Sequence, residues 1–240
     1  MAQPFVFENA QGASEACAGK ILELLGQALA TQPRASLAIS GGSTPKLMFA
    51  VMAKANFDWS RVHLFWVDER VVPPTDSQSN YRLAKEHFID PSHFPLQNVH
   101  RVEGELPAKE AAKRYEDDIR GFFGSVPGAI PQFDVVHRGI GPDAHTASLF
   151  PGEPAIDDHK NLVAAVYVEK FQQWRVTLLP AVLEAARNTL MLAAGDDKAE
   201  PLKEVMRGAY DPKKYPAQIG TYDGHDVLWF LDKAAARLVG

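Results

Sequence analysis

Short apolar runs alternate with helix-forming segments along the chain, and this alternation limits the possible folds more than any other feature. The runs lie at residues 36–40, 62–67, 133–140, 162–168, 189–195 and 227–231. Most are apolar at successive positions, which is typical of strands buried on both faces of a parallel sheet. We therefore predict an α/β fold with a single doubly wound, mostly parallel sheet and helices on both faces, in one domain spanning residues 1–240.

The segments between these runs have the spacing of amphipathic helices. We expect helices over residues 14–30, from Pro45 to about 54, and over 79–88, 107–123 and 197–207, with others after Pro180 and Leu231. In residues 14–30, for example, apolar side chains recur at the three- and four-residue spacing of one helix face. The segment 208–225 is rich in loop-forming residues and is consistent with a flap or a subunit contact.

Composition and charge disfavour several classes of function. The 240 residues carry a net charge of -5 with acidic and basic residues interspersed, which argues against nucleic-acid and membrane partners. The single cysteine, Cys17, rules out an intramolecular disulfide framework and fits a reducing compartment. The N-terminus lacks the basic and apolar regions of a secretory signal. We expect a cytoplasmic protein that is a monomer or a small homo-oligomer.

The predicted sheet indicates where a ligand site lies. In open parallel sheets, ligands bind beyond the carboxyl ends of the strands, so the residues that follow each strand are the candidates. Gly41, Gly42, Ser43 and Thr44 follow one strand and precede a helix. Glycines permit a tight turn, and the amides at a helix start, with two hydroxyls, can bind a phosphate. A simple helix cap accounts for these four residues equally well.

Three charged residues follow the next strand. Asp68, Glu69 and Arg70 come directly after residues 62–67. Burying them unpaired is costly, so we expect them to face water or a ligand. A solvated loop with a structural ion pair is the alternative.

Two further basic residues occur in settings that suggest an anion site. Arg175 lies in an apolar stretch, and Lys198 follows residues 189–195 at a helix start. Cations near the Gly-Gly-Ser-Thr turn would make it a phosphate site, because amides alone only partly offset a dianion. A surface charge is the alternative for each.

An acidic residue and a histidine follow the strand at residues 133–140. Asp143 and His145 are two positions apart beside a glycine turn. A carboxylate near an imidazole can fix its tautomer and raise its basicity, which prepares a general base. The spacing of histidines, cysteines and carboxylates indicates no metal site, and Cys17, on a predicted helix, is a poor candidate for a nucleophile.

The same stretch imitates a dinucleotide-binding motif. Residues 139–144 match the pattern G-x-G-x-x-A after a strand. Pro142 lies inside the turn, however, and Pro151 follows within two helical turns, which leaves little room for the required helix. The motif also lies past mid-chain, so we disfavour an oxidoreductase.

Several motifs together resemble one family. SGGSTP, VDER, SQSNYR, GIGPDAHTASLFPG, a long block from Arg175 to Leu202, and VLWFLDKAAA occur in order over about residues 35–235. They resemble bacterial members of the glucosamine-6-phosphate deaminase/6-phosphogluconolactonase family. The resemblance implies a fold shared with ribose-5-phosphate isomerase. It also implies hydrolysis of a phosphosugar lactone, 6-phospho-D-glucono-1,5-lactone, in the oxidative pentose phosphate pathway, by a carboxylic ester hydrolase without metal or cofactor.

The resemblance also implies roles for individual residues. His145 is similar to the general base that activates water, Asp143 to its orienting partner, and Arg70 to a cation that stabilises developing negative charge. The expected substrate- and phosphate-binding residues are Gly41, Gly42, Ser43, Thr44, Asp68, Arg175 and Lys198.

The sequence departs from the family pattern at two places. Ala144 stands where the family usually has glycine, so a positive φ there would strain the backbone. His137 and Arg138 stand in a strand that is usually apolar, where a charged pair either disturbs the burial of the strand or marks a local difference from the family.

Two other functions deserve comparison. Glucosamine-6-phosphate deaminase has a glutamate shortly after the corresponding histidine, and residues 146–151 here contain no acid. Ring opening and proton shuttling need that extra group, whereas ester hydrolysis does not. A phosphosugar-binding module of a transcription regulator is normally joined to a DNA-binding domain, and the α/β pattern here begins by about residue 14.

Overall fold

The computed structural model describes residues 4–126, 128–222 and 227–239, and within them six strands form the central sheet. Their order is β1 (Phe5–Phe7), β9 (Val227–Asp232), β8 (Thr189–Ala193), β5 (Val135–Arg138), β2 (Ala35–Ile39) and β3 (Val62–Trp66). Every neighbouring pair in this order is parallel. The mostly parallel sheet predicted from the sequence is confirmed.

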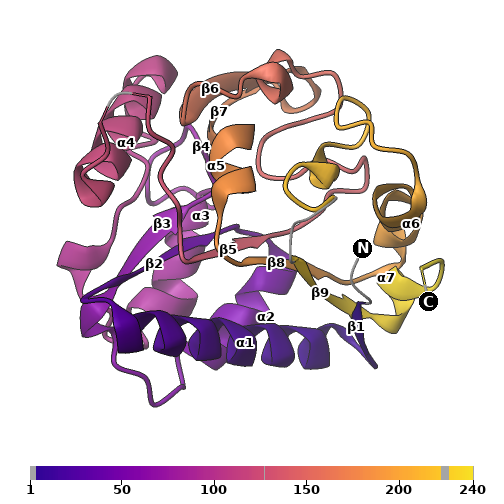
Figure 1. Cartoon of the computed structure of the whole chain (residues 1–240), viewed down its shortest axis with the longest axis horizontal. Helices are drawn as coiled ribbons and strands as arrows, with labels where there is room; N and C mark the ends of the chain where they lie inside the picture. Colours follow the sequence, from indigo (N-terminus) through magenta and orange to yellow (C-terminus); the bar gives the residue numbers. More distant parts are fainter. Residues whose placement is uncertain (1–3, 127, 223–226, 240) are drawn as a thin grey trace.

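Helices cover both faces of this sheet (Figure 1). One face packs against α1 (Ala10–Thr31), α2 (Ser43–Met52) and α3 (Asn80–Ala84), which continues into a short π-helix at Lys85–Ile89. The other face packs against α4 (Ala108–Phe123), α5 (Pro180–Ala185), α6 (Ala199–Arg207) and α7 (Lys233–Ala236). The alternation in the sequence therefore corresponds to helices that bury both sides of each central strand.

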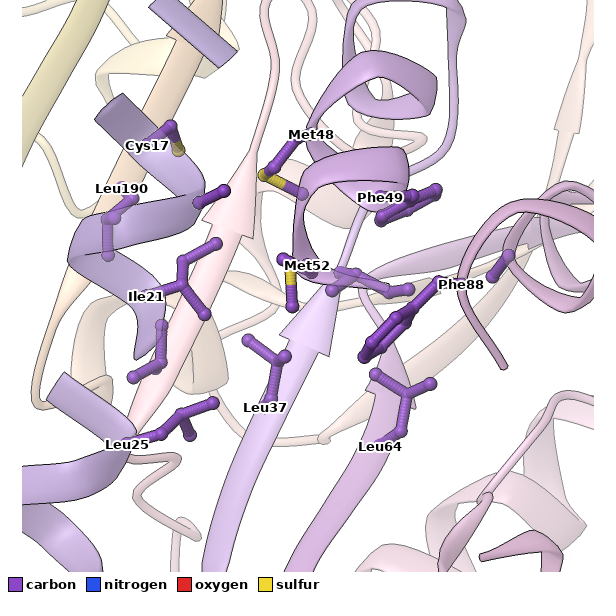
Figure 2. Packing of buried hydrophobic residues seen from close by; sticks show 14 of the residues in the cluster. Cys17, Ile21, Leu25, Leu37, Met48, Phe49, Met52, Leu64, Phe88 and Leu190 are labelled. Atoms are coloured by element: carbon purple, nitrogen blue, oxygen red, sulfur yellow. The ribbon is translucent and has the colours of Figure 1, made fainter. Parts of the chain in front are cut away.

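The core between α1, α2 and the sheet is apolar and tightly packed. Figure 2 shows Ile21 and Leu25 of α1 and Met48 and Met52 of α2 around Leu37 of β2, and all five are fully buried. The helix face predicted for α1 is the face that packs here.

The lone cysteine belongs to this core. Cys17 is fully buried on α1 (Figure 2). Burial raises the pKa of its thiol, which keeps it protonated and inert as a nucleophile.

A second, smaller sheet corrects one sequence prediction. Residues 162–168 form a strand, β6 (Val163–Val168), but it does not join the parallel sheet. It pairs antiparallel with β7 (Gln173–Leu178), which pairs antiparallel with β4 (Asp68–Arg70). Only four residues separate β6 from β7, and a parallel connection needs a dozen or more.

The loop-rich segment 208–225 supports the structure over the part that is described, while residues 223–225 lie outside the described residues. Residues 216–221 are buried. The Ala217 N–H donates to the Ala144 carbonyl at 2.9 Å. Residues 216–221 are therefore packed against the loop after β5, whereas residues 208–215 are exposed or half-buried. Within the described residues, no helix is both long and apolar enough to cross a bilayer.

His137 and Arg138, the unusual pair in β5, are fully buried. His137 Nδ1 accepts a hydrogen bond from the Ser40 N–H at 3.4 Å, and burial lowers the pKa of the ring to about 3. Arg138 Nη2 donates to the Ile219 carbonyl at 2.8 Å, and burial lowers its pKa to about 10. The strand accommodates both side chains and keeps its place in the sheet.

The buried histidine generates a prediction about stability in acid. His137 is neutral in the folded protein down to about pH 3, whereas an unfolded chain protonates it below about pH 6.5. The free energy of unfolding should therefore fall as pH drops through this window, by up to about 1.4 kcal/mol per pH unit. His137→Gln should remove about 2 kcal/mol of the loss between pH 7 and pH 5, measured by urea denaturation.

His87→Gln provides the matched control, because His87 is partly exposed. It should keep the wild-type pH dependence. If His137→Gln also kept it, the assignment of His137 as a neutral buried ring would be wrong.

Candidate active site

A cavity of about 220 Å³ opens where the direction of the strand order reverses. From β2 the chain passes to β3 on one side and later returns to β5 on the other. The connections after β2 and β5 therefore diverge and leave a crevice at the carboxyl ends of the strands. Residues that line it include Ser40, Gly41, Asp68, Arg70, Asn80, Gly141, His145, Thr146, Arg175 and Lys198.

The predicted pair of Asp143 and His145 forms in the loop after β5. His145 Nδ1 is hydrogen bonded to Asp143 Oδ1, and Lys170 Nζ lies 3.1 Å from Asp143 Oδ2. Partial burial raises the pKa of Asp143, but the bonds to His145 and Lys170 outweigh it and hold that pKa well below its usual range. An ionised Asp143 accepts the Nδ1–H and leaves Nε2 of His145 with its lone pair free.

The turn that carries this pair is tight. Ala144 has a φ of 63°, in the left-handed region anticipated from its place in the family motif. A residue with a side chain is strained there by about 1–2 kcal/mol. Its N–H donates to the Gly141 carbonyl at 3.0 Å, and its own carbonyl accepts from Ala217. These two bonds hold the strained conformation in place.

Gly141 leaves room for the His145 ring. A Cβ at this position would lie 2.0 Å from His145 Nδ1, closer than any real side chain approaches. The ring therefore lies directly against the backbone of Gly141. On its flat side, His145 stacks on Phe150, with ring centroids 4.1 Å apart and an angle of 26°. Asp143, Gly141 and Phe150 together fix the orientation of the imidazole.

Two arginines face each other beside the cavity. Arg70 of β4 lies opposite Arg175 of β7 in the antiparallel register. Like charges in this position destabilise a sheet. The Nε atoms of both are buried and, within the part of the chain that the structure describes, have no hydrogen-bond partner. Burial lowers the pKa of Arg175, and Asp68 opposes that effect. This arrangement suits an anion that bridges the two guanidinium groups.

Asp68 and Glu69 have different surroundings. Asp68 lines the cavity, and its Oδ2 accepts from Ser148 Oγ at 2.7 Å. Glu69 is 2% exposed, so the expectation that it faces water or a ligand is wrong. Its carboxylate accepts the N–H groups of Asn80 and Tyr81 at 2.8 and 2.7 Å, at the start of α3. Burial raises the pKa of Glu69, and the free amides at this helix N-terminus oppose that effect.

The predicted phosphate turn lies at the start of α2. Gly41 lines the cavity. Gly42 has a φ of 126°, which favours glycine, and no side chain caps the helix. Ser43 and Thr44 follow in the first turn of α2, next to the cavity but not among its lining residues. Lys198, after β8, lines the cavity and also pairs with Asp197 at 2.7 Å.

The cavity thus brings together six residues proposed from the sequence, with a seventh, Asp143, bonded to one of them. The six are Gly41, Asp68, Arg70, His145, Arg175 and Lys198. Sequence reasoning did not propose Phe150 or Lys170 as parts of the site, although Phe150 lies inside the motif around His145. Across the described ranges, no group of three or more metal-binding side chains is present.

Comparisons with known proteins place these features in context. A family model described as "Glucosamine-6-phosphate isomerases/6-phosphogluconolactonase" matches residues 8–229. The chain is 37% identical over 217 residues to a 6-phosphogluconolactonase of a Nostoc species, which spans 90% of this chain and 89% of that relative. A solved 6-phosphogluconolactonase from Thermotoga maritima is 30% identical, with a TM-score of 0.83 and coverage of 95% and 98%.

The fold is also found with another activity. A solved monomeric glucosamine-6-phosphate deaminase is 17% identical, with a TM-score of 0.83 over 99% of this chain and 100% of that one. The fold by itself therefore does not decide between lactone hydrolysis and deamination.

The contact between Gly141 and the imidazole generates a prediction. Gly141→Ala should push the His145 ring away from Asp143, because the added methyl overlaps Nδ1. We expect the low-field Nδ1–H resonance of His145 in the proton NMR spectrum to disappear. The same resonance should persist in Gly139→Ala, because a Cβ at residue 139 would lie 3.7 Å from its nearest neighbour, the Leu192 carbonyl oxygen. A resonance that survived in both variants would contradict the proposed packing of the ring.

Proposed function

The chain belongs to the glucosamine-6-phosphate isomerase/6-phosphogluconolactonase family, and we propose that it hydrolyses 6-phospho-D-glucono-1,5-lactone to 6-phosphogluconate. The observation that carries this proposal is the Asp143–His145 pair beside two arginines in one cavity. We further propose that the enzyme acts in the cytoplasm, in the oxidative pentose phosphate pathway. Its proposed partner is its small-molecule substrate, and we propose no nucleic-acid or membrane partner.

His145 is proposed as the general base. Its Nε2 takes a proton from water as the water oxygen bonds to the lactone carbonyl carbon, and Asp143 stabilises the imidazolium that forms. The carbonyl oxygen becomes negatively charged in this step, and Arg70 lies in the same cavity to stabilise that charge. The bond from the carbonyl carbon to the ring oxygen then breaks, and the ring oxygen takes the proton back from the His145 imidazolium, which gives a carboxylic acid and a hydroxyl group and restores the neutral ring.

The other cations are proposed to hold the phosphate. Lys198 and Arg175 line the cavity with Gly41, next to the uncapped start of α2. Amides at a helix start together with two cations suit a phosphate dianion. Gly42, Ser43 and Thr44 are assigned to this role through their position in the first turn of α2, and Asp68 to support of the site.

Deamination of glucosamine 6-phosphate is less well supported. The residues after His145 are Thr146, Ala147 and Ser148, none of which is acidic. The Thr146 hydroxyl donates to the Gly139 carbonyl at 3.0 Å, and the Ser148 hydroxyl is bonded to Asp68. These groups therefore do not supply the second acid/base group that ring opening and proton shuttling require.

Lactone hydrolysis is tested directly with freshly prepared substrate. The protein should release 6-phosphogluconate faster than the spontaneous reaction, and His145→Ala should lose about 100-fold or more of that rate. The variant should still bind 6-phosphogluconate, as measured by calorimetry. Release of ammonia from glucosamine 6-phosphate without lactone hydrolysis would favour the deaminase instead.

The phosphate-binding role is tested by comparing two lactones. Lys198→Met should raise KM for the phosphorylated lactone about 10- to 100-fold, because it removes one charge-assisted hydrogen bond. Activity on unphosphorylated gluconolactone should be unaffected by the same change. Lys203→Met on α6, an exposed lysine outside the cavity lining, should alter neither. An equal loss with both lactones would assign Lys198 a structural role.

A further inference from the structure

The turn between β6 and β7 reaches the catalytic loop from a distant part of the chain. It spans Glu169–Phe171, with Gln172 in a left-handed conformation. Its Lys170 pairs with Asp143 at 3.1 Å, across 27 positions of the sequence. The Lys170 Nζ also lies 5.6 Å from the centre of the Phe171 ring.

Further contacts fix the position of this turn. Phe171 packs edge-on against Phe150, the ring that stacks on His145, with centroids 5.8 Å apart. The Arg175 guanidinium lies over both phenylalanine rings, at 5.1 Å from Phe171 and 5.8 Å from Phe150. Gln173 donates to the side chain of Gln78 at 2.7 Å, which links the hairpin to the loop after β4. The turn is thus held at the site by aromatic and polar contacts.

Because the turn brings Lys170 to Asp143, the two carboxylate oxygens of Asp143 have different partners. Oδ1 is bonded to His145 Nδ1, and Oδ2 is bonded to Lys170. A carboxylate held at both oxygens cannot rotate freely about its side-chain bond. Its negative charge is also shared between the imidazole and an ammonium group.

We infer that Lys170 is a positioning residue that holds Asp143 in place and limits how strongly Asp143 raises the proton affinity of His145. Lys170 acts through Asp143. Its loss shifts the pH at which His145 becomes free to accept a proton from water.

The sign of the effect follows from the charges around the ring. The charged groups that face His145 are Asp143 on its own loop, Lys170 in the hairpin turn, Arg175 on β7, Asp68 and Arg70 on β4, and Lys198 after β8. Without Lys170, more of the charge of Asp143 acts on the protonated ring. The ring then keeps its proton to a higher pH, and the acid limb of the kcat/KM profile moves upward.

The size of the effect is limited by solvent. The Lys170 side chain is 57% exposed, so its charge is screened. We expect Lys170→Met to shift the acid limb of the kcat/KM profile upward by about half a pH unit. This is the effect of a screened charge that contacts Asp143 and not the His145 ring itself. That shift corresponds to a rate about threefold lower at pH values below the midpoint. Lys170→Arg should restore the wild-type profile.

A direct measurement separates this inference from the proposed function on which its kinetic readout rests. The Cε1–H resonance of His145, assigned by its loss in His145→Gln, is followed by NMR from pH 5 to pH 9. Its midpoint should be about half a unit higher in Lys170→Met than in the wild type. This titration needs no substrate, so it tests Lys170 even if lactone hydrolysis is not observed.

Lys113→Met is the matched control. Lys113 forms a similar exposed pair with Asp117, at 2.6 Å on α4, and does not line the cavity. It should leave the titration unchanged. An unshifted or lowered midpoint in Lys170→Met would overturn the inference. A raised KM with an unshifted midpoint would also overturn it and make Lys170 a substrate-binding residue.

Discussion

Parallel pairing of β2 with both β3 and β5 forces the connections after β2 and β5 to leave the sheet in different directions, and the cavity lies between them. Residues that directly follow the strands can therefore line this cavity. Gly41 follows β2, His145 lies in the loop after β5, and Lys198 follows β8. The antiparallel sheet contributes the two arginines, because Arg70 of β4 and Arg175 of β7 lie opposite each other and both line the cavity.

The position of the loop that carries His145 depends on contacts from distant parts of the chain. The left-handed Ala144 is bonded to Ala217, in a segment that the sequence marks only as loop-rich. The hairpin turn holds the opposite side of Asp143 through Lys170. Strain in a turn persists where surrounding structure fixes it on several sides. The conformation of the loop that carries Asp143 and His145 therefore depends on these two contacts.

Local patterns predicted five of the six parallel strands, the helices and most of the candidate site, because periodicity and strand-end position are properties of short segments. Arg175 and Lys198 also stood out as charges at unusual places. Contacts between residues far apart in the sequence could not be predicted in the same way. Residues 162–168 have the composition of a buried parallel strand, and only their pairing with β7 shows otherwise. Glu69 looks exposed until the start of α3 supplies its partners, and Lys170 has no signal in its own neighbourhood.

The opposed arginines also have a consequence for how long the protein survives. Without an anion between them, Arg70 and Arg175 repel each other in a setting where one is nearly buried. An anion that binds at these arginines binds the folded chain and not the unfolded one, so it shifts the folding equilibrium by mass action. Proteases degrade the unfolded form, and degradation therefore slows when such an anion is abundant. Repulsion between two neighbouring cations in this way links the lifetime of the folded protein to the supply of the anions that bind there.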